Sequence, residues 1–268
     1  MIIDGQLYIS QSLLKDWENM CGIAFKVKHF TPFKNEEDNP FYIGNKDVVV
    51  LGNIYEQSII GISRGGKTTK PSPELAKKPI FNRMKEQAKL TKEWLRSLDG
   101  RIIAVQDRIK ASFEWNGIQV FIVGHLDIRF QDTDGTPRNI DLKLSGDRDA
   151  SFGDFQWKNL DRLTYDQPKQ YNLLLHLETG FPVDRIPFDY HIGDTSTAMK
   201  VKVINVMTSE QTIEFHKERL YEAYIGISEA LELDYFEPRN DYDRCSVCPI
   251  KEDCKYRNKT PLIEYVEI

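Results

Sequence analysis

Two aspartates and a lysine stand close together in the middle of the chain, on a stretch that reads as a β-hairpin. The first strand of this hairpin, within residues 120–144, carries Asp127, and the second carries Asp141 and Lys143. Successive side chains on a strand point to opposite faces, so Asp141 and Lys143 share a face. Two carboxylates and an ammonium on one sheet can hold a metal ion and stabilise a reacting anion.

The turn of this hairpin decides whether the two aspartates meet. Asp134-Gly135 is a strong hairpin signal. If Gly135 takes the left-handed conformation that closes a three-residue loop, residues whose numbers sum to 268 lie opposite each other, and Asp127 faces Asp141. A two-residue loop would shift the register by one and separate them.

Like charges directly opposite each other destabilise a sheet, and a divalent cation such as Mg²⁺ would relieve the repulsion because it binds carboxylate oxygens. The alternative is a solvated hairpin with alternating charges. The apolar residues beside Asp127 and Asp141 favour a central position in the sheet over an exposed edge.

The composition is that of an ordinary globular chain of 268 residues, 40% hydrophobic and 29% charged, with a net charge of −5. No apolar run has membrane-spanning length, and the first residues do not resemble a leader peptide. These features predict a cytoplasmic protein with no membrane contact, and the net charge gives no support for nucleic-acid binding.

One segment is locally basic. Residues 64–93 contain nine Lys or Arg against three Glu, a net charge of +6. Arg64, Lys67 and Lys70, in a flexible linker, are candidate contacts for the phosphates of a nucleic acid. For the helical part of the segment, from Pro73 onwards, the alternative to a phosphate-contacting surface is a solvated helical face.

The four cysteines form the second pattern with a chemical meaning. Cys245, Cys248 and Cys254 follow a C-x2-C-x5-C spacing, and Cys21 lies near the other end of the chain. Disulfides would suit a secreted protein, whereas in a reducing compartment the spacing indicates a zinc site or an iron–sulfur cluster.

The periodicity predicts an α/β (α+β) fold with a central mixed β-sheet and flanking helices. The expected helices cover residues 10–25, 73–98 with an interruption near Pro79, 166–179 and 208–233, and the expected strands form a meander over 101–144 and two strands over 183–192 and 198–207. Residues 47–61 read as a strand or the start of a helix. We expect a single domain over 1–268, with a basic helical insertion at about 64–98 and a loop-like cysteine segment at 238–260.

Four short motifs, in order along the chain, resemble the RecB-like branch of the PD-(D/E)XK nuclease superfamily. They are Gly52-x-x-x-Glu56, Gly124-x-x-Asp127, Asp141-x-Lys143 and Gln167-x-x-x-Tyr171. The resemblance implies a restriction-endonuclease-like core. One departure is Gln106-Asp107, which stands where many relatives carry a glutamate.

The cysteines extend the resemblance. They are similar to the pattern of the AddB nuclease domain and the CRISPR-associated RecB-like exonucleases, in which one N-terminal and three C-terminal cysteines bind a [4Fe-4S] cluster. The resemblance, which runs from Ser10 to Cys254, therefore implies a cluster at Cys21, Cys245, Cys248 and Cys254, with Zn²⁺ as the alternative.

The family implies a metal-dependent DNA nuclease, most simply an exonuclease acting on single-stranded or open DNA ends. Asp127, Asp141 and Glu56, with the backbone carbonyl of Leu142, would bind Mg²⁺ or Mn²⁺, and Lys143 would stabilise the hydroxide and the transition state. The alternative for Lys143 is a surface lysine. Recombination, replication or CRISPR-adaptation proteins would suit as partners.

Gln167 and Tyr171, one turn apart on a helix, would flank the phosphate, and the alternative is a helix cap and a core aromatic. His125 reads first as a hydrogen-bonded strand histidine and second as a phosphate or metal contact. The stretch around Arg64 lacks the spacing of an ATP-binding loop, so no helicase activity is expected.

Two other functions remain open from the sequence. One is a catalytically inactive nucleic-acid-binding or scaffold subunit on a nuclease fold. The other is an iron–sulfur redox protein. Retention of all the acidic positions and the lysine argues against the inactive subunit, because a silent site would not need them.

Overall fold

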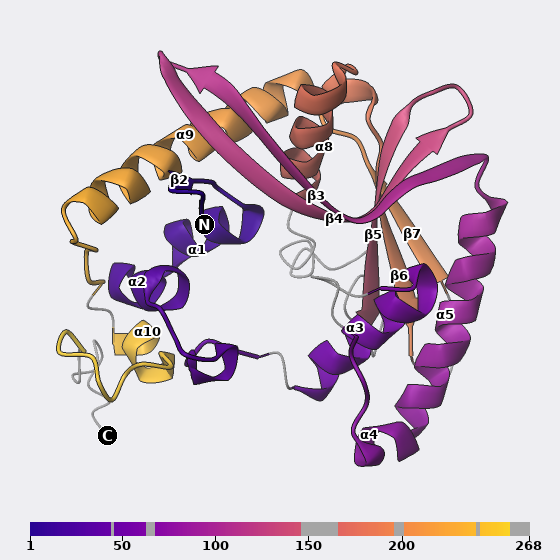
Figure 1. Ribbon diagram of the computed structural model, residues 1–268, viewed down its shortest axis with the longest axis horizontal. Coiled ribbons are helices and arrows are strands. Elements are labelled where there is room, and N and C mark those ends of the chain that lie inside the picture. Colours follow the sequence, from indigo (N-terminus) through magenta and orange to yellow (C-terminus); the bar gives the residue numbers. More distant parts are fainter. Residues whose placement is uncertain (44–45, 63–67, 146–165, 196–200, 240–241, 258–268) are drawn as a thin grey trace, which may run out of the picture. The chain divides into compact units, whose positions relative to one another are not determined.

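The structure of the protein is a computed structural model, and the residues that it describes are 1–43, 46–62, 68–145, 166–195, 201–239 and 242–257 (Figure 1). The chain divides into two compact units. One consists of residues 1–44 and 219–268, and the other of residues 45–218. Among the described residues, no helix is long and apolar enough to cross a membrane.

The second unit is built on a five-stranded sheet. Its strands, in spatial order, are β3 (Gly100–Trp115), β4 (Ile118–Asp132), β5 (Pro137–Ser145), β6 (Phe188–Asp194) and β7 (Val201–Val206). The pairs β3–β4, β4–β5 and β6–β7 are antiparallel, whereas β5 and β6 are parallel. A parallel pair needs a crossover connection, and α8 (Asp166–Thr179) lies within it. The mixed sheet confirms the predicted α+β class.

The register of the central hairpin is the one that the sequence predicts. Ile128 pairs with Ile140, and the following pairs continue to Gln131 with Pro137, so the residue numbers of each pair sum to 268. Gly135 has a φ of 90°, and the Asp132 N–H donates to the Thr136 carbonyl at 2.9 Å. The left-handed glycine therefore closes the three-residue loop as expected.

One face of this sheet is covered by α3 (Asp47–Ile60), α4 (Pro73–Lys77) and α5 (Pro79–Ser97) (Figure 1). Their apolar side chains form one core with four residues of β4 and β5, namely Ile128, Phe130, Ile140 and Leu142. Pro79 occupies the first turn of α5, which confirms the interruption predicted there. Of the two interpretations of residues 47–61, the structure confirms the helix, which ends at Ile60.

Helix α8 covers the opposite face of β5. The Asn172 side chain donates to the Ile186 carbonyl at 2.8 Å and accepts from the Asn139 side chain at 2.9 Å. Gly124 of β4 lets the helix approach closely, because a Cβ atom there would lie 2.5 Å from Leu174. Strand alternation places Asp141 and Lys143 on the same face of β5 as Asn139.

Two boundaries in the second unit differ from the predictions. The strand expected from residue 183 begins only at Phe188, because Val183–Arg185 form a 3-10 turn ahead of Pro187. The long helix expected over 208–233 is α9 (Glu210–Glu232), and its residues fall in both units.

The first unit contains the two ends of the chain. Besides part of α9, it holds β1 (Ile2–Ile3), β2 (Gln6–Leu7), α1 (Gln11–Asn19), α2 (Gly22–Phe30), the 3-10 turn Glu36–Asp38 and α10 (Tyr242–Val247). The short helix α10 corrects the expectation that the whole cysteine segment is a loop.

The single helix expected over residues 10–25 was wrong, because the chain breaks into α1 and α2. Met20 and Cys21 are extended, and the Gly22 N–H donates to the Glu237 carbonyl at 3.0 Å. A Cβ atom at Gly22 would lie 2.4 Å from that oxygen. The break therefore comes from a contact with a residue more than two hundred positions away in the sequence.

Candidate active site and cysteine pocket

Asp127 lies where β4 and β5 begin to separate. Their ladder ends at the pair of Ile128 with Ile140, so Asp127 is the next residue beyond it. Instead of a further backbone pair, the Leu142 N–H donates to Asp127 Oδ2 at 2.9 Å. The carboxylate of Asp127 is thus held against the main chain of β5, beside Asp141.

Asp141 is 3% exposed and is held by two side chains. Gln167 Nε2, from the first turn of α8, donates to Asp141 Oδ1 at 2.5 Å. Lys143 Nζ forms an ion pair with Asp141 Oδ2. The structure therefore brings together Asp141, Lys143 and Gln167, three of the residues that the resemblance implies.

Lys143 is a cation in this environment. Burial opposes its charged form, but the carboxylates of Asp141 and Asp127 outweigh burial and raise its pKa above the ordinary value of 10.5. Its side chain is 35% exposed and its ammonium lies 5.9 Å from the centre of the Tyr190 ring. Lys143 can therefore stabilise negative charge at neutral pH but is not a proton acceptor there.

Glu56, on α3, is linked to Asp127 through Gln106, a residue to which the sequence analysis assigned no role. Gln106 Nε2 lies 3.5 Å from Glu56 Oε2 and 3.4 Å from Asp127 Oδ1. Gln106 has a φ of 50°, in the middle of β3. Its only sequence signal was its place where relatives of the resembled family carry a glutamate.

Tyr171 is placed in the core. It is 6% exposed, its ring lies beside Gly124, and its centre is 6.0 Å from that of Phe188. Its helix spacing from Gln167 nevertheless puts both on α8, and Tyr171 contributes electrostatically to the environment of Lys143.

The remaining candidates belong to the basic segment and to β4 and β5. Arg64 and Lys67 lie outside the described residues, and Lys70 is exposed. His125, on β4 opposite Arg108, is half-buried. The described contact of Leu142 is made by its N–H, so a metal-binding role for its carbonyl stays a prediction.

The donor set suits a hard cation, because Asp127, Asp141 and Glu56 offer carboxylate oxygens. As the side chains stand, however, no group of three or more His, Cys, Asp or Glu in the described part of the chain is arranged to hold a metal ion. The Gln106 amide and the Lys143 ammonium contact these oxygens instead. A cation can enter only if these contacts rearrange.

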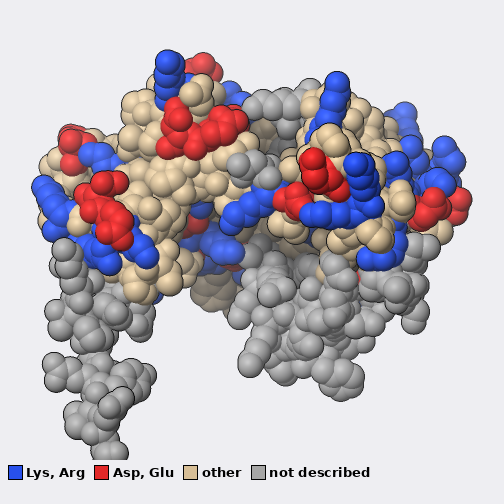
Figure 2. Space-filling view, turned by 90° about the horizontal axis from the view of Figure 1, so that it is seen from below, with Lys and Arg blue, Asp and Glu red and all other residues tan. Residues whose placement is uncertain are grey.

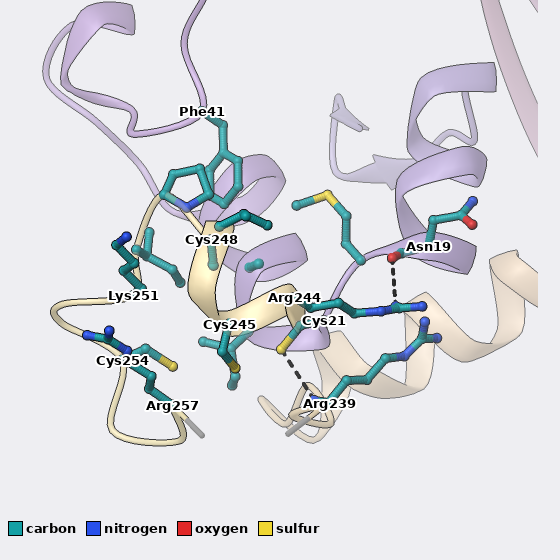
Figure 3. A pocket seen from close by; sticks show the side chains of 16 residues that line it. Asn19, Cys21, Phe41, Arg239, Arg244, Cys245, Cys248, Lys251, Cys254 and Arg257 are labelled. Atoms are coloured by element: carbon teal, nitrogen blue, oxygen red, sulfur yellow. Dashed lines mark hydrogen bonds between the residues drawn. The ribbon is translucent and has the colours of Figure 1, made fainter. Parts of the chain in front are cut away.

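The four cysteines line one pocket of the first unit, with a volume of about 210 Å³ (Figure 3). The sulfur of Cys21 accepts a hydrogen bond from the Arg239 N–H at 3.3 Å. Burial, together with the neighbouring thiols of Cys21, Cys254 and Cys245, raises the pKa of Cys248. All four described cysteines are free, so the pocket gathers thiols and not disulfides.

The rest of this pocket combines apolar and basic side chains. The apolar lining is formed by Met20, Ile23, Ala24, Phe41, Val247, Pro249 and Ile250, and the basic residues are Arg239, Arg244, Lys251 and Arg257. Thiolates are anions, and basic neighbours stabilise them. The chemistry of this lining fits a group that binds four thiolates.

The fold is also found in a solved structure. A crystal structure named "Putative exonuclease" from Eubacterium rectale superposes with a TM-score of 0.53 at 15% identity, covering 97% of this chain and 91% of that one. A phage related exonuclease from Haemophilus somnus 129PT gives a TM-score of 0.38 at 16% identity, covering 84% and 96%. No family model and no curated protein matches the sequence.

These observations define a class. A mixed five-stranded sheet flanked by helices, with carboxylates and a lysine at the β4–β5 separation, is a restriction-endonuclease-like α+β fold. At 15% identity the likeness establishes the fold alone.

Proposed function

We propose that this chain is a metal-dependent nuclease that hydrolyses phosphodiester bonds in DNA. The observation that carries the proposal is the convergence of Asp127, Asp141, Glu56 and Lys143 around the separation of β4 and β5. The names of the structural neighbours, which describe exonucleases, agree with it.

The chemistry of phosphodiester hydrolysis explains why these residue types occur together. The phosphate is anionic and repels hydroxide, and both the attack and the leaving alkoxide add negative charge. Asp127, Asp141 and Glu56 would hold Mg²⁺ or Mn²⁺, which supplies water activation and charge neutralisation there.

Two further residues complete the site. Lys143, whose pKa is raised, remains positively charged at neutral pH and would stabilise the charge that develops on the phosphate. Gln167 donates to Asp141 and so fixes the direction of that carboxylate. Tyr171 supports the helix that carries Gln167 by packing on Gly124.

Charges of both signs are mixed on the face of the described residues that Figure 2 draws. Local contacts by the basic segment, such as Lys70, would then guide a strand. We propose single-stranded or open DNA ends as the substrate, since a free strand can be held by such local contacts.

The test is digestion of end-labelled linear and circular DNA, single- and double-stranded, in titrations of Mg²⁺ and Mn²⁺ and with EDTA. Asp141→Ala and Lys143→Ala should abolish cleavage while the circular dichroism spectrum stays that of the wild type. Asp99→Asn, at an exposed position, serves as the matched control. Activity that persists through Asp141→Ala or in EDTA would refute the proposal, and a wild type inert on every substrate would favour the inactive scaffold.

For the cysteine pocket we propose a [4Fe-4S] cluster in preference to Zn²⁺. Four cysteines line one pocket, and an N–H group already donates to the Cys21 sulfur. The spacing suits either group, and the cluster is preferred because one N-terminal and three C-terminal cysteines resemble the pattern of the iron–sulfur nucleases. Protein purified without oxygen should be brown and contain iron, and a colourless preparation containing only zinc would overturn this.

A further inference from the structure

Gln106 has a backbone conformation that its surroundings must impose. It lies in the middle of the 16-residue strand β3, yet its φ is 50°. The neighbouring pairs of the ladder are regular, with Val105 opposite Ile128 and Asp107 opposite Leu126. A residue with a Cβ atom is strained in the left-handed region, and such strain persists only where the surrounding structure imposes it.

The side chain of Gln106 lies between two carboxylates. Its amide nitrogen is 3.5 Å from Glu56 Oε2 and 3.4 Å from Asp127 Oδ1, both longer than an optimal hydrogen bond. Its amide oxygen is buried and has no hydrogen-bond partner among the described residues. A buried oxygen without a partner is costly, so the present orientation of the amide is incompletely satisfied.

We propose that Gln106 serves the metal site in both its empty and its loaded state, an inference that rests on the proposed function. Without a cation, its amide nitrogen holds the carboxylates of Glu56 and Asp127 together. With a cation, rotation of the terminal amide by half a turn presents its oxygen to the ion. That rotation leaves the backbone in place, and an amide oxygen is a suitable ligand for Mg²⁺ or Mn²⁺.

The charge of the site determines what a glutamate at this position would do. The carboxylates of Glu56, Asp127 and Asp141 carry three negative charges and Lys143 one positive charge, which leaves two negative charges. One divalent cation neutralises them. A glutamate at position 106 would add a fourth carboxylate, which would repel the others whenever the site holds no cation.

The experiment measures Mn²⁺ binding directly, from the electron paramagnetic resonance signal of free Mn²⁺, beside thermal unfolding with and without Mn²⁺. Gln106→Ala and Gln106→Gly should each raise the Kd for Mn²⁺ by about tenfold or more, as expected for a lost supporting ligand. The glycine variant should unfold at a higher temperature than the alanine variant, because glycine accepts a positive φ. Gln119→Ala, at an exposed glutamine on β4, is the matched control.

The Gln106→Glu variant distinguishes the two roles, because a purely structural role of Gln106 would not change the response of the unfolding temperature to Mn²⁺. Its unfolding temperature without Mn²⁺ should fall below that of the wild type, and the rise on adding Mn²⁺ should exceed the wild-type rise. Alanine and glycine variants that bind Mn²⁺ as tightly as Gln119→Ala would overturn the proposal.

The same measurements separate this proposal from the nuclease proposal. A wild type that binds Mn²⁺ but cleaves no DNA would refute the nuclease and leave the assignment of Gln106 standing on the binding data. A wild type whose cleavage is abolished by EDTA, with Gln106→Ala binding Mn²⁺ as tightly as Gln119→Ala, would overturn the role of Gln106 alone.

Discussion

The carboxylate cluster and the cysteine pocket are assembled in opposite ways. Asp127 and Asp141 are already fixed by the Leu142 N–H and by Gln167, so the sheet and α8 hold the cluster before any ligand binds. In the cysteine pocket, the Arg239 backbone N–H donates to the Cys21 sulfur and the Ile250 backbone N–H donates to the Cys248 sulfur. The first site is organised by the sheet and α8, whereas the second is lined by segments from the two ends of the chain.

The largest effect expected from this comparison is on catalysis. Asp141→Asn should lower DNA cleavage by about a thousandfold or more, because the neutral amide weakens cation binding and leaves Lys143 without its ion pair. Iron bound per chain should stay at the wild-type level. Loss of iron in this variant would show that the two sites depend on each other.

A substitution in the cysteine pocket should instead affect the stability of the protein. Cys248→Ser should remove most of the bound iron and lower the unfolding midpoint by about 5 °C or more, since binding at a structural site contributes to folding free energy. Val48→Ser, at a 70% exposed position outside the pocket lining, should change neither. Calorimetry and iron analysis check this, and unchanged iron in Cys248→Ser would remove that residue from the site.

A smaller effect is expected on the acid side of neutrality. His191 of β6 is 0% exposed, its ring lies 4.3 Å from that of Trp94, and burial lowers its pKa to about 4. The unfolded chain takes up a proton near pH 6.5, so the stabilisation is complete above that pH and is lost as the pH falls towards 4.

Between pH 6.5 and about pH 4, protonation of His191 should lower the free energy of unfolding by at most about 3 kcal/mol. Urea unfolding at several pH values measures it. His191→Phe should flatten the dependence over that interval, and an equally steep dependence in this variant would assign it to other groups.

The smallest effects, on the free energy of unfolding, are expected at Gly124 and Gly52, the two glycines of the motifs that resemble the nuclease family. Gly124→Ala should lower the free energy of unfolding by about 1–3 kcal/mol, because its Cβ atom would lie 2.5 Å from Leu174. Gly52→Ala, within α3, should raise it by about 0.5–1 kcal/mol, because no atom lies within 4 Å of the added Cβ. Urea unfolding of both variants checks this, and a destabilised Gly52→Ala would contradict it.

The sequence predicts the local parts of this structure better than the long-range ones. The hairpin register follows from Asp134-Gly135, whose backbone preference acts over a few residues. The break between α1 and α2 does not follow, because it depends on the contact of Gly22 with Glu237. The spacing around Gly22 gives only a helical pattern.

The candidate site also contains both local features that the sequence predicts and long-range features that it does not. Asp141 and Lys143 share a face by strand alternation alone. The placement of Gln106 between Glu56 and Asp127 requires a positive φ in mid-strand, which glutamine does not favour and no local pattern indicates. Tyr171 could be assigned to its helix, and its place in the core is the alternative that the sequence left open.

The order of the chain gives the two sites different times of completion during synthesis on the ribosome. The carboxylate cluster needs residues from Glu56 to Gln167, together with β6, whose parallel pairing secures β5. The cysteine pocket is complete only after Cys254 has been synthesised and can join Cys21. Because non-local contacts form only after both partners have emerged, a nascent chain carries neither site until well over half of it has been made.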